Sequence, residues 1–187
     1  MTPDLYILRH GETVWNREGR MQGHLNAPLT ATGEDQARRQ GAVLATRDLG
    51  GFAFYTSPLA RAVQTAALAL ADLATEIRTD DRLREIDVGA WSGQLRRDFA
   101  PDAATEGPDG DLSVYARAPG EGLDSVAARA RSFVEGLDGP AVIVCHGIVS
   151  RFLRCAALGL PDAAWTDLPG GQGNVFHLSA GRMEELR

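Results

Sequence analysis

Two short apolar runs, each leading into a His-Gly pair, constrain the fold of this chain most. The first covers residues 5–8 and leads into Arg9-His10-Gly11, and the second covers residues 141–145 and leads into His146-Gly147. Apolar runs that do not alternate with polar residues are typical of strands buried on both faces of a parallel sheet. Parallel strands deliver the groups that follow them to one edge of the sheet, where open α/β folds bind ligands. If the two strands are neighbours, the sequence therefore predicts that both histidines meet at this edge.

Strand and helix patterns alternate along the rest of the chain. We expect further strands at residues 52–56, 76–78 and 174–178, and helices at residues 30–48, 58–71, 124–137 and 148–158. Before the second helix, Ser57-Pro58 predicts an N-cap followed by proline at the first helical position. Strands that alternate with helices predict an α/β fold, in a three-layer α/β/α arrangement with a mostly parallel central sheet.

The length of 187 residues suits one domain with a sizeable core. We expect residues 1–187 to form this single domain, with residues from about 94 to 122 as an excursion over the active site. From residue 98 this segment is rich in Asp, Gly, Pro and Ala and has few large apolar residues. Such a composition is typical of a functional or solvated loop.

The overall charge argues against two classes of partner. The formal net charge is −6 and the isoelectric point is about 5.2, whereas a nucleic-acid or anionic-membrane binder needs a basic face. Any anion site must therefore be a local cluster of basic residues.

No apolar run is long enough for a membrane span, and the N-terminus has no basic region before an apolar one, so we expect a cytoplasmic protein. Two cysteines, Cys145 and Cys155, are too few for a disulfide framework and are interpreted as buried structural residues.

Two arginines lie close to the two histidines in the predicted arrangement. Arg9 directly precedes His10, and Arg61 falls in the first turns of the helix after Ser57-Pro58, near its free N–H groups and positive dipole end. A phosphoryl group in transfer carries charge on three equatorial oxygens, which two arginines and one histidine can hold. The other histidine would be free to attack phosphorus.

Four sequence blocks, in this order, resemble the histidine phosphatase superfamily, the phosphoglycerate-mutase-like proteins. The blocks are Leu8-Arg9-His10-Gly11-Glu12-Thr13, Ser57-Pro58-Leu59-Ala60-Arg61-Ala62-Val63-Gln64-Thr65-Ala66, Leu83-Arg84-Glu85 with Gly89-Ala90-Trp91, and His146-Gly147. They lie within residues 5 to about 155. A single block of this kind has little specificity, whereas four in the family's order are specific.

The resemblance implies a role for each residue that matches the family's motifs. His10 would be the nucleophile, which takes the phosphoryl group onto a ring nitrogen as phosphohistidine. Glu85 would donate a proton to the leaving oxygen and later help to take one from water, and Arg9, Arg61 and His146 would complete the catalytic set. Phosphate contacts would come from Arg9, Asn16, Gln22, Gly23, Arg61, His146 and Gly147. We expect no metal ion or other cofactor, because arginines and histidines stabilise the charge.

Departures from the family pattern favour a hydrolase over a mutase. Relatives often have Trp-Glu-Gly where this chain has Trp91-Ser92-Gly93, and the chain lacks an evident counterpart of the long basic insertion of cofactor-dependent phosphoglycerate mutases. We therefore expect a small phosphorylated substrate and inorganic phosphate as the product. The alternative is a phosphoglycerate mutase or an α-ribazole-phosphatase-like enzyme.

Two further classes remain open at this point. One is a non-catalytic phosphate-binding module on the same fold, and the other is a metallohydrolase that uses His10, His146 and a carboxylate such as Asp87. Among the other candidates, we interpret His24 as a loop residue, His177 as structural and Glu12 as a positioning residue rather than the proton donor.

Overall fold

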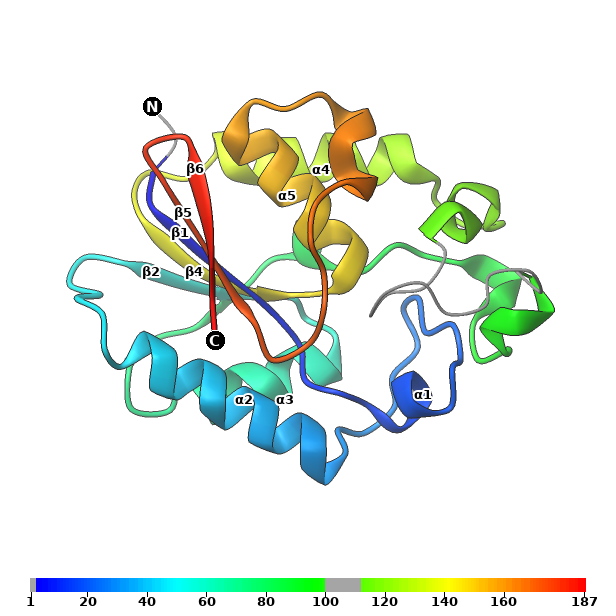
Figure 1. Cartoon of the computed structure of the whole chain (residues 1–187), viewed down its shortest axis with the longest axis horizontal. Helices are drawn as coiled ribbons and strands as arrows, with labels where there is room; N and C mark the ends of the chain where they lie inside the picture. The colour runs from blue at the N-terminus through cyan, green and yellow to red at the C-terminus, as the bar shows by residue number, and fades with distance from the viewer. Residues whose placement is uncertain (1–2, 100–111) are drawn as a thin grey trace.

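A six-stranded mixed sheet forms the centre of the protein (Figure 1). The computed structural model describes residues 3–99 and 112–187. The strands are β1 Leu5–Arg9, β2 Ala53–Thr56, β3 Arg78–Thr79, β4 Ala141–Cys145, β5 Val175–Ser179 and β6 Arg182–Leu186. Their spatial order is β3-β2-β4-β1-β5-β6, in which β3, β2, β4 and β1 run parallel. β5 pairs antiparallel with β1, and β6 pairs antiparallel with β5. The mostly parallel sheet is confirmed.

Helices cover both faces of the sheet, so the predicted three-layer α/β/α arrangement is confirmed (Figure 1). The helices are α1 Val14–Arg17, α2 Ala31–Leu44, α3 Ala60–Ala69, α4 Leu123–Glu135 and α5 Gly147–Leu158, with short 3₁₀ turns η1 Asp81–Leu83, η2 Gly89–Trp91, η3 Arg96–Asp98, η4 Leu112–Arg117 and η5 Asp162–Thr166. α2 and α3 pack on one face, and α4 and α5 pack on the other. None of the helices in the described part of the chain is long and apolar enough to cross a membrane.

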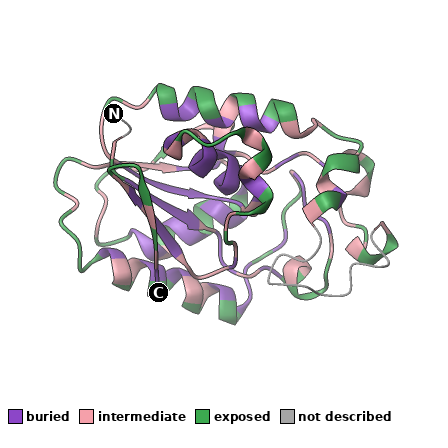
Figure 2. Ribbon diagram, turned by 45° about the horizontal axis from the view of Figure 1, so that its top comes forward, coloured by how far each residue is buried: buried purple, intermediate pink, exposed green. Residues whose placement is uncertain are grey.

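Alternate side chains of β1 pack into two separate hydrophobic cores, one on each face of the sheet. This explains why apolar and polar residues do not alternate along the strand. Leu5 and Ile7 pack in the cluster that includes side chains of α4 and α5, whereas Tyr6 and Leu8 pack in the cluster with α2 and α3. Residues 5–8 of β1 and all of β4 are accordingly buried (Figure 2). Burial of each large aliphatic side chain contributes roughly 1.5–3 kcal/mol to stability. The two central strands are therefore held firmly in place, and so are the residues that follow them at the carboxyl edge of the sheet.

Several predicted boundaries were wrong. α2 ends at Leu44 rather than at residue 48, and a turn follows in which Thr46 donates its hydroxyl to the carbonyl of Val43. α3 begins at Ala60, with Leu59 at the N-cap position, so Ser57 does not cap it. The short strand β3 covers Arg78–Thr79 rather than residues 76–78.

The final strand, β6, was not predicted. It pairs with β5 across a turn at Ala180-Gly181, where both residues have positive φ, as a tight hairpin requires. In the segment from about 94 to 122, residues 100–111 lie outside the described residues. The described remainder includes η3 and η4, which both contribute to the wall of the cavity described below.

A close approach of two backbone segments places the first turn of α2 beside the turn that follows β1. A Cβ added to Gly33 would lie 2.0 Å from the carbonyl oxygen of Glu12, and one added to Gly11 would lie 2.1 Å from that of Gly33. We predict that Gly33→Ala lowers the free energy of unfolding by about 1–3 kcal/mol, because backbone atoms must move apart. Urea unfolding measures this, with Gly139→Ala as the control, since its added Cβ meets nothing within 4 Å. Equal stability of both variants would contradict the close packing.

Candidate active site

The two histidines meet because the strands that precede them are neighbours. β1 and β4 pair in parallel with Arg9 opposite Cys145, and the backbone N–H of His10 continues the ladder to the carbonyl oxygen of Cys145 at 2.9 Å. The rings of His10 and His146 lie with their centroids 5.1 Å apart at an interplanar angle of 60°. The predicted juxtaposition at the carboxyl edge of the sheet is confirmed.

The hydrogen bonds of His10 determine which ring nitrogen carries the proton and which has a lone pair. Its Nδ1 lies 2.8 Å from the carbonyl oxygen of Gly11, and a carbonyl only accepts, so Nδ1 carries the proton and Nε2 has the lone pair. Arg61 donates its Nε–H toward this Nε2 at 3.3 Å. Burial, followed by the charges of Arg61 and Arg9, lowers the pKa of His10 well below 6.5. The imidazole is therefore neutral at neutral pH, as a nucleophile must be.

His146 is buried completely and is held by a serine. Its Nε2 lies 2.7 Å from the hydroxyl oxygen of Ser57, which also accepts the backbone N–H of Leu59 at 3.3 Å. Burial, followed by the charges of Arg61 and His10, lowers the pKa of His146 well below 6.5. Ser57 thus fixes the orientation of a neutral imidazole, which explains why it does not cap α3.

Arg61 is a buried cation fixed by the loop that precedes α2. Its guanidinium donates to the carbonyl oxygens of Gly23 at 2.8 Å and Leu25 at 2.7 Å, and to Oδ1 of Asn26 at 3.2 Å. Burial lowers its pKa to about 10, so Arg61 remains charged at neutral pH. Its place in the first turn of α3 agrees with the sequence prediction.

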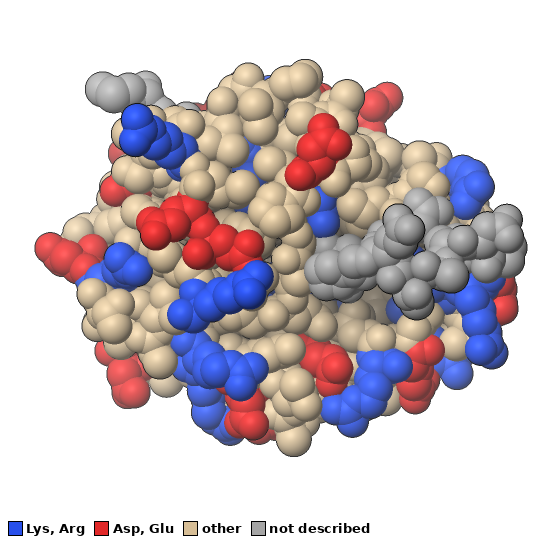
Figure 3. Space-filling view, viewed as in Figure 1, with Lys and Arg blue, Asp and Glu red and all other residues tan. Residues whose placement is uncertain are grey.

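A cavity of about 280 Å³ opens beside this cluster. It is lined by Arg9, Glu12, Asn16, Gly19, Arg20, Met21, Glu85, Arg96, Leu112, Tyr115, Gly147, Ile148 and Gln172. The Arg9 guanidinium packs over Gly147, where an added Cβ would lie 3.2 Å from its Cζ. On the face shown in Figure 3, arginines and acidic residues are interspersed among the described residues.

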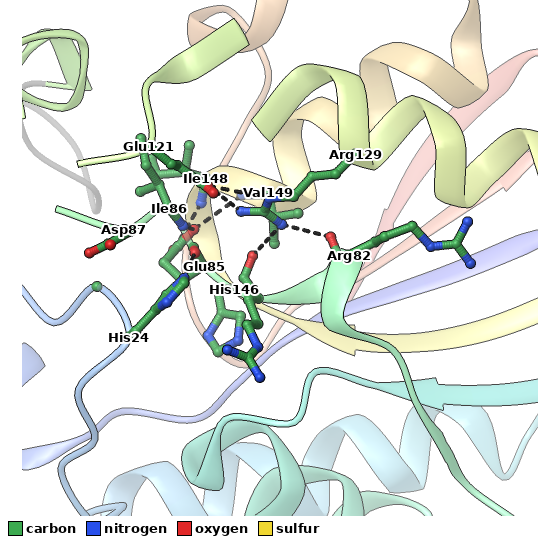
Figure 4. A network of polar contacts seen from close by, with 12 residues as sticks. His24, Arg82, Glu85, Ile86, Asp87, Glu121, Arg129, His146, Ile148 and Val149 are labelled. Carbon is green, nitrogen blue, oxygen red and sulfur yellow. Dashed lines mark hydrogen bonds and ion pairs between the residues drawn. The ribbon is translucent and has the colours of Figure 1, made fainter. Parts of the chain in front are cut away.

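Glu85 reaches the cavity from the loop between η1 and η2. Its Oε1 accepts the backbone N–H groups of Ile86 at 2.9 Å and Val149 at 3.2 Å, and its Oε2 accepts that of Ile148 at 3.1 Å (Figure 4). Two of these donors belong to the first turn of α5, which begins directly after His146. The first turn of α5 therefore holds the carboxylate of the predicted proton donor close to His146, the residue that precedes the helix.

The other predicted phosphate contacts differ in position. Asn16 lines the cavity, and its Oδ1 accepts from the backbone N–H of Thr13 and from Nε2 of Gln172. Gln22 and Gly23 do not line this cavity. Gly23 instead accepts a hydrogen bond from Arg61, so this segment supports a cation of the cluster.

Three side interpretations can be compared with the structure. The pKa of Glu12 is lowered by a hydrogen bond from Thr30, so its carboxylate accepts, which fits a positioning residue. His177 stacks on Tyr6 with ring centroids 4.3 Å apart, which is a structural contact. Burial raises the pKa of Cys145 to about 12, so this thiol is inert.

Sequence reasoning missed Gln172, whose Nε2 donates to Oδ1 of Asn16 at 3.0 Å within the cavity wall. It lies in the glycine-rich segment just before β5. Because β5 runs antiparallel to β1, its beginning lies at the same edge as the end of β1. The glycines were a usable signal, but the direction of β5 was needed to interpret it.

The metallohydrolase alternative required three side chains to converge. Within residues 3–99 and 112–187, no group of three or more His, Cys, Asp and Glu side chains is placed to hold a metal ion. The carboxylate of Asp87 accepts the backbone N–H of Gly89 at 2.8 Å, and Figure 4 shows it pointing away from His146. The geometry does not bring Asp87 together with the two histidines.

Both buried histidines make stability depend on pH. Because folding lowers their pKa values below 6.5, the unfolded chain binds more protons, so stability is full above pH 6.5 and is lost as the pH falls below it. We predict a loss of about 1.4 kcal/mol per pH unit for each histidine in this range. Urea unfolding between pH 7.5 and 5 measures the slope, and His146→Asn should reduce it. Identical slopes in the variant and the wild type would contradict the assignment.

Comparisons with known proteins identify the family. The sequence profile of the histidine phosphatase superfamily (branch 1) matches residues 5–184. A glucosyl-3-phosphoglycerate phosphatase of Mycolicibacterium vanbaalenii is 37% identical over 187 aligned residues, which cover 91% of this chain and 80% of the relative. A Salmonella paratyphi C protein named "Probable phosphoglycerate mutase GpmB" is 36% identical over 175 residues, which cover 87% of this chain and 77% of the relative.

A solved structure agrees with this result. The mycobacterial glucosyl-3-phosphoglycerate phosphatase in complex with VO3 matches with a TM-score of 0.80 and 33% identity, over 98% of this chain and 97% of that one. The sequence match extends over nearly the whole chain, and the fold and the order of the motif residues agree with it. The chain therefore belongs to branch 1 of the histidine phosphatase superfamily.

Proposed function

We propose that this protein is a metal-independent phosphomonoester hydrolase that acts on a small phosphorylated metabolite through a phosphohistidine at Nε2 of His10. One observation carries the proposal. The Gly11 carbonyl holds the proton of His10 on Nδ1, which leaves a neutral imidazole with its lone pair on Nε2, directed toward the cation Arg61. The same proposal places the enzyme in the cytoplasm, where two unpaired thiols such as Cys145 and Cys155 are usual.

Phosphoryl oxygens would be held by Arg9, Arg61 and His146. Nδ1 of His146 is buried and has no hydrogen-bond partner among the described residues. When the Ser57 hydroxyl donates to Nε2, Nδ1 carries the proton and can donate it to a phosphoryl oxygen. Further contacts would come from the backbone N–H of Gly147, at the start of α5, and from Asn16, whose amide oxygen is already engaged, so its nitrogen would donate. Gln22 and Gly23 would act through Arg61.

The reaction would proceed in two displacements at phosphorus. Nε2 of His10 forms the P–N bond as the P–O bond to the leaving group breaks, and Glu85 gives the leaving oxygen its proton. A water molecule then attacks phosphorus and gives a proton to Glu85, while the P–N bond electrons return to Nε2. Arg9 and Arg61 stabilise the charge on the equatorial oxygens in both steps without reorganisation.

A test follows from the covalent intermediate. During turnover of a ³²P-labelled phosphomonoester, an alkaline denaturing quench should trap label on the wild type, and this label should be lost on mild acid treatment, as a P–N bond is. His10→Asn should carry none. In parallel, the partition of phosphate between water and added glycerol should be the same for several aryl phosphates, because one intermediate supplies both products. A partition that changes with the leaving group would refute the intermediate.

The GpmB relative favours a second candidate, a phosphoglycerate mutase. The cavity is lined by Arg9, Arg20 and Arg96, which suits an anionic substrate. A mutase returns the phosphoryl group to the substrate, whereas a hydrolase releases phosphate. Incubation with 3-phosphoglycerate and with a panel that includes glucosyl-3-phosphoglycerate separates them. Release of phosphate without isomerisation is expected.

A further inference from the structure

Glu85 lies in a loop without strand or helix, yet proton transfer requires its side chain to point in one direction. Its carboxylate is held by the N–H groups of Ile148 and Val149, but the direction of the Cα–Cβ bond depends on the two peptide planes that flank Glu85. Contacts to these two planes therefore decide where the carboxyl group can reach.

Arg129 of α4 holds the peptide plane before Glu85. One of its terminal nitrogens, Nη1, donates to the carbonyl oxygens of Arg82 and Arg84, each at 2.6 Å, and the Arg84 carbonyl belongs to the peptide bond that joins Arg84 to Glu85. The other side of the guanidinium is paired with Glu121, whose Oε1 lies 2.6 Å from Nη2. Because the ion pair with Glu121 fixes the plane of the guanidinium group, Nη1 has little freedom to move away from the two carbonyl oxygens.

His24 holds the peptide plane that follows Glu85. Its Nε2 donates to the carbonyl oxygen of Glu85 at 2.9 Å, and this carbonyl belongs to the peptide bond between Glu85 and Ile86. Figure 4 shows His24 and Arg129 on opposite sides of Glu85. The two side chains come from segments far apart in the sequence, the loop before α2 and the helix α4.

We infer that Arg129 and His24 are positioning residues that fix the direction of the Glu85 side chain for proton transfer to the leaving group. This inference rests on the proposed function, in which Glu85 is the proton donor. With both flanking peptide planes tethered, φ and ψ of Glu85 are fixed, and the carboxyl group stays where it lines the cavity. Loss of one tether lets the loop shift, and a displacement of about 1 Å in such a group can cost roughly 100-fold in rate.

The test uses the dependence of kcat/KM on the leaving group. Dinitrophenyl phosphate releases an oxygen that needs no proton, whereas an alkyl phosphate releases one that does. Glu85→Gln should lower kcat/KM for the alkyl ester by about 10²–10⁴-fold and affect the dinitrophenyl ester far less. Arg129→Met and His24→Phe should show the same pattern, with losses of about 10–100-fold for the alkyl ester only.

The ratio of the two kcat/KM values does not depend on the fraction of folded enzyme, so partial unfolding of a variant leaves the test valid. His24→Gln, which keeps an N–H donor, should restore part of the ratio. Arg129→Met in the Glu85→Gln background should leave the ratio unchanged, because its effect passes through Glu85. Arg131→Met is the control, since Arg131 lies on the same helix in an exposed ion pair with Asp162.

Two results would overturn the inference, and they are distinguishable. Equal losses for both esters in Arg129→Met and His24→Phe, with a leaving-group effect in Glu85→Gln, would mean that the tethers only stabilise the fold. Equal losses in Glu85→Gln itself would remove its role as proton donor, and the inference with it. The label on His10 tests the rest of the proposed function separately.

Discussion

Replacing His10 with Asn should lower kcat for phosphomonoester hydrolysis by about 10⁴-fold or more, because the variant has no ring nitrogen that can form the P–N bond. The amide group of Asn can still donate to the Gly11 carbonyl, as Nδ1 of His10 does, so the turn after β1 keeps its hydrogen bond. Arg9, Arg61 and His146 remain in place. Binding of inorganic phosphate, measured by calorimetry, should therefore change by about 10-fold or less.

His177→Asn is the matched control for this variant. It also removes an imidazole from the sheet, but one that stacks on Tyr6 outside the cluster. Its kcat should remain at the wild-type level even if its unfolding midpoint falls. If His10→Asn kept more than a small fraction of the wild-type kcat in a preparation free of other phosphatases, another group would have to be the nucleophile.

The two central strands could be predicted from the sequence because their composition depends on burial alone. β1 and β4 are buried on both faces, so their composition is apolar without alternation, and this pattern predicts central parallel strands. Because the two strands run parallel, their carboxyl ends lie at the same edge of the sheet. The juxtaposition of His10 and His146 needed only one further condition, that the two strands pair directly, and the register confirms it.

Features that depend on a partner elsewhere in the chain did not follow from the sequence. Ser57 before Pro58 has the local pattern of an N-cap, but its hydroxyl is used by His146, which lies 89 positions further along the chain. The roles of Arg129 and His24 depend on carbonyl groups of residues 82–85. Every residue has a backbone carbonyl, so the sequence does not show which carbonyls accept such hydrogen bonds. Tertiary hydrogen bonds therefore overrode local preference at these positions, and they gather around the candidate site.

Arg61→Met should lower kcat/KM by about 10²–10³-fold and also destabilise the protein. The catalytic loss arises because a fixed cation beside Nε2 of His10 is removed from a site where it faces the developing charge. The stability loss arises because the carbonyl groups of Gly23 and Leu25 lose their donor. Each costs about 1–3 kcal/mol when left unpaired, although removal of a buried charge offsets part of this. We expect a net loss of about 1–3 kcal/mol.

Arg61→Lys separates charge from geometry. Lysine keeps the positive charge, but its single nitrogen cannot serve Gly23, Leu25 and a phosphoryl oxygen in the directions that the guanidinium does. We therefore expect kcat/KM to remain at least about 10-fold below wild type. Arg38→Met, which removes an exposed arginine paired with Glu34, should change the unfolding free energy by less than about 1 kcal/mol. Full activity in Arg61→Lys would show that charge alone matters at this position and that the planar geometry of the guanidinium group is not required for catalysis.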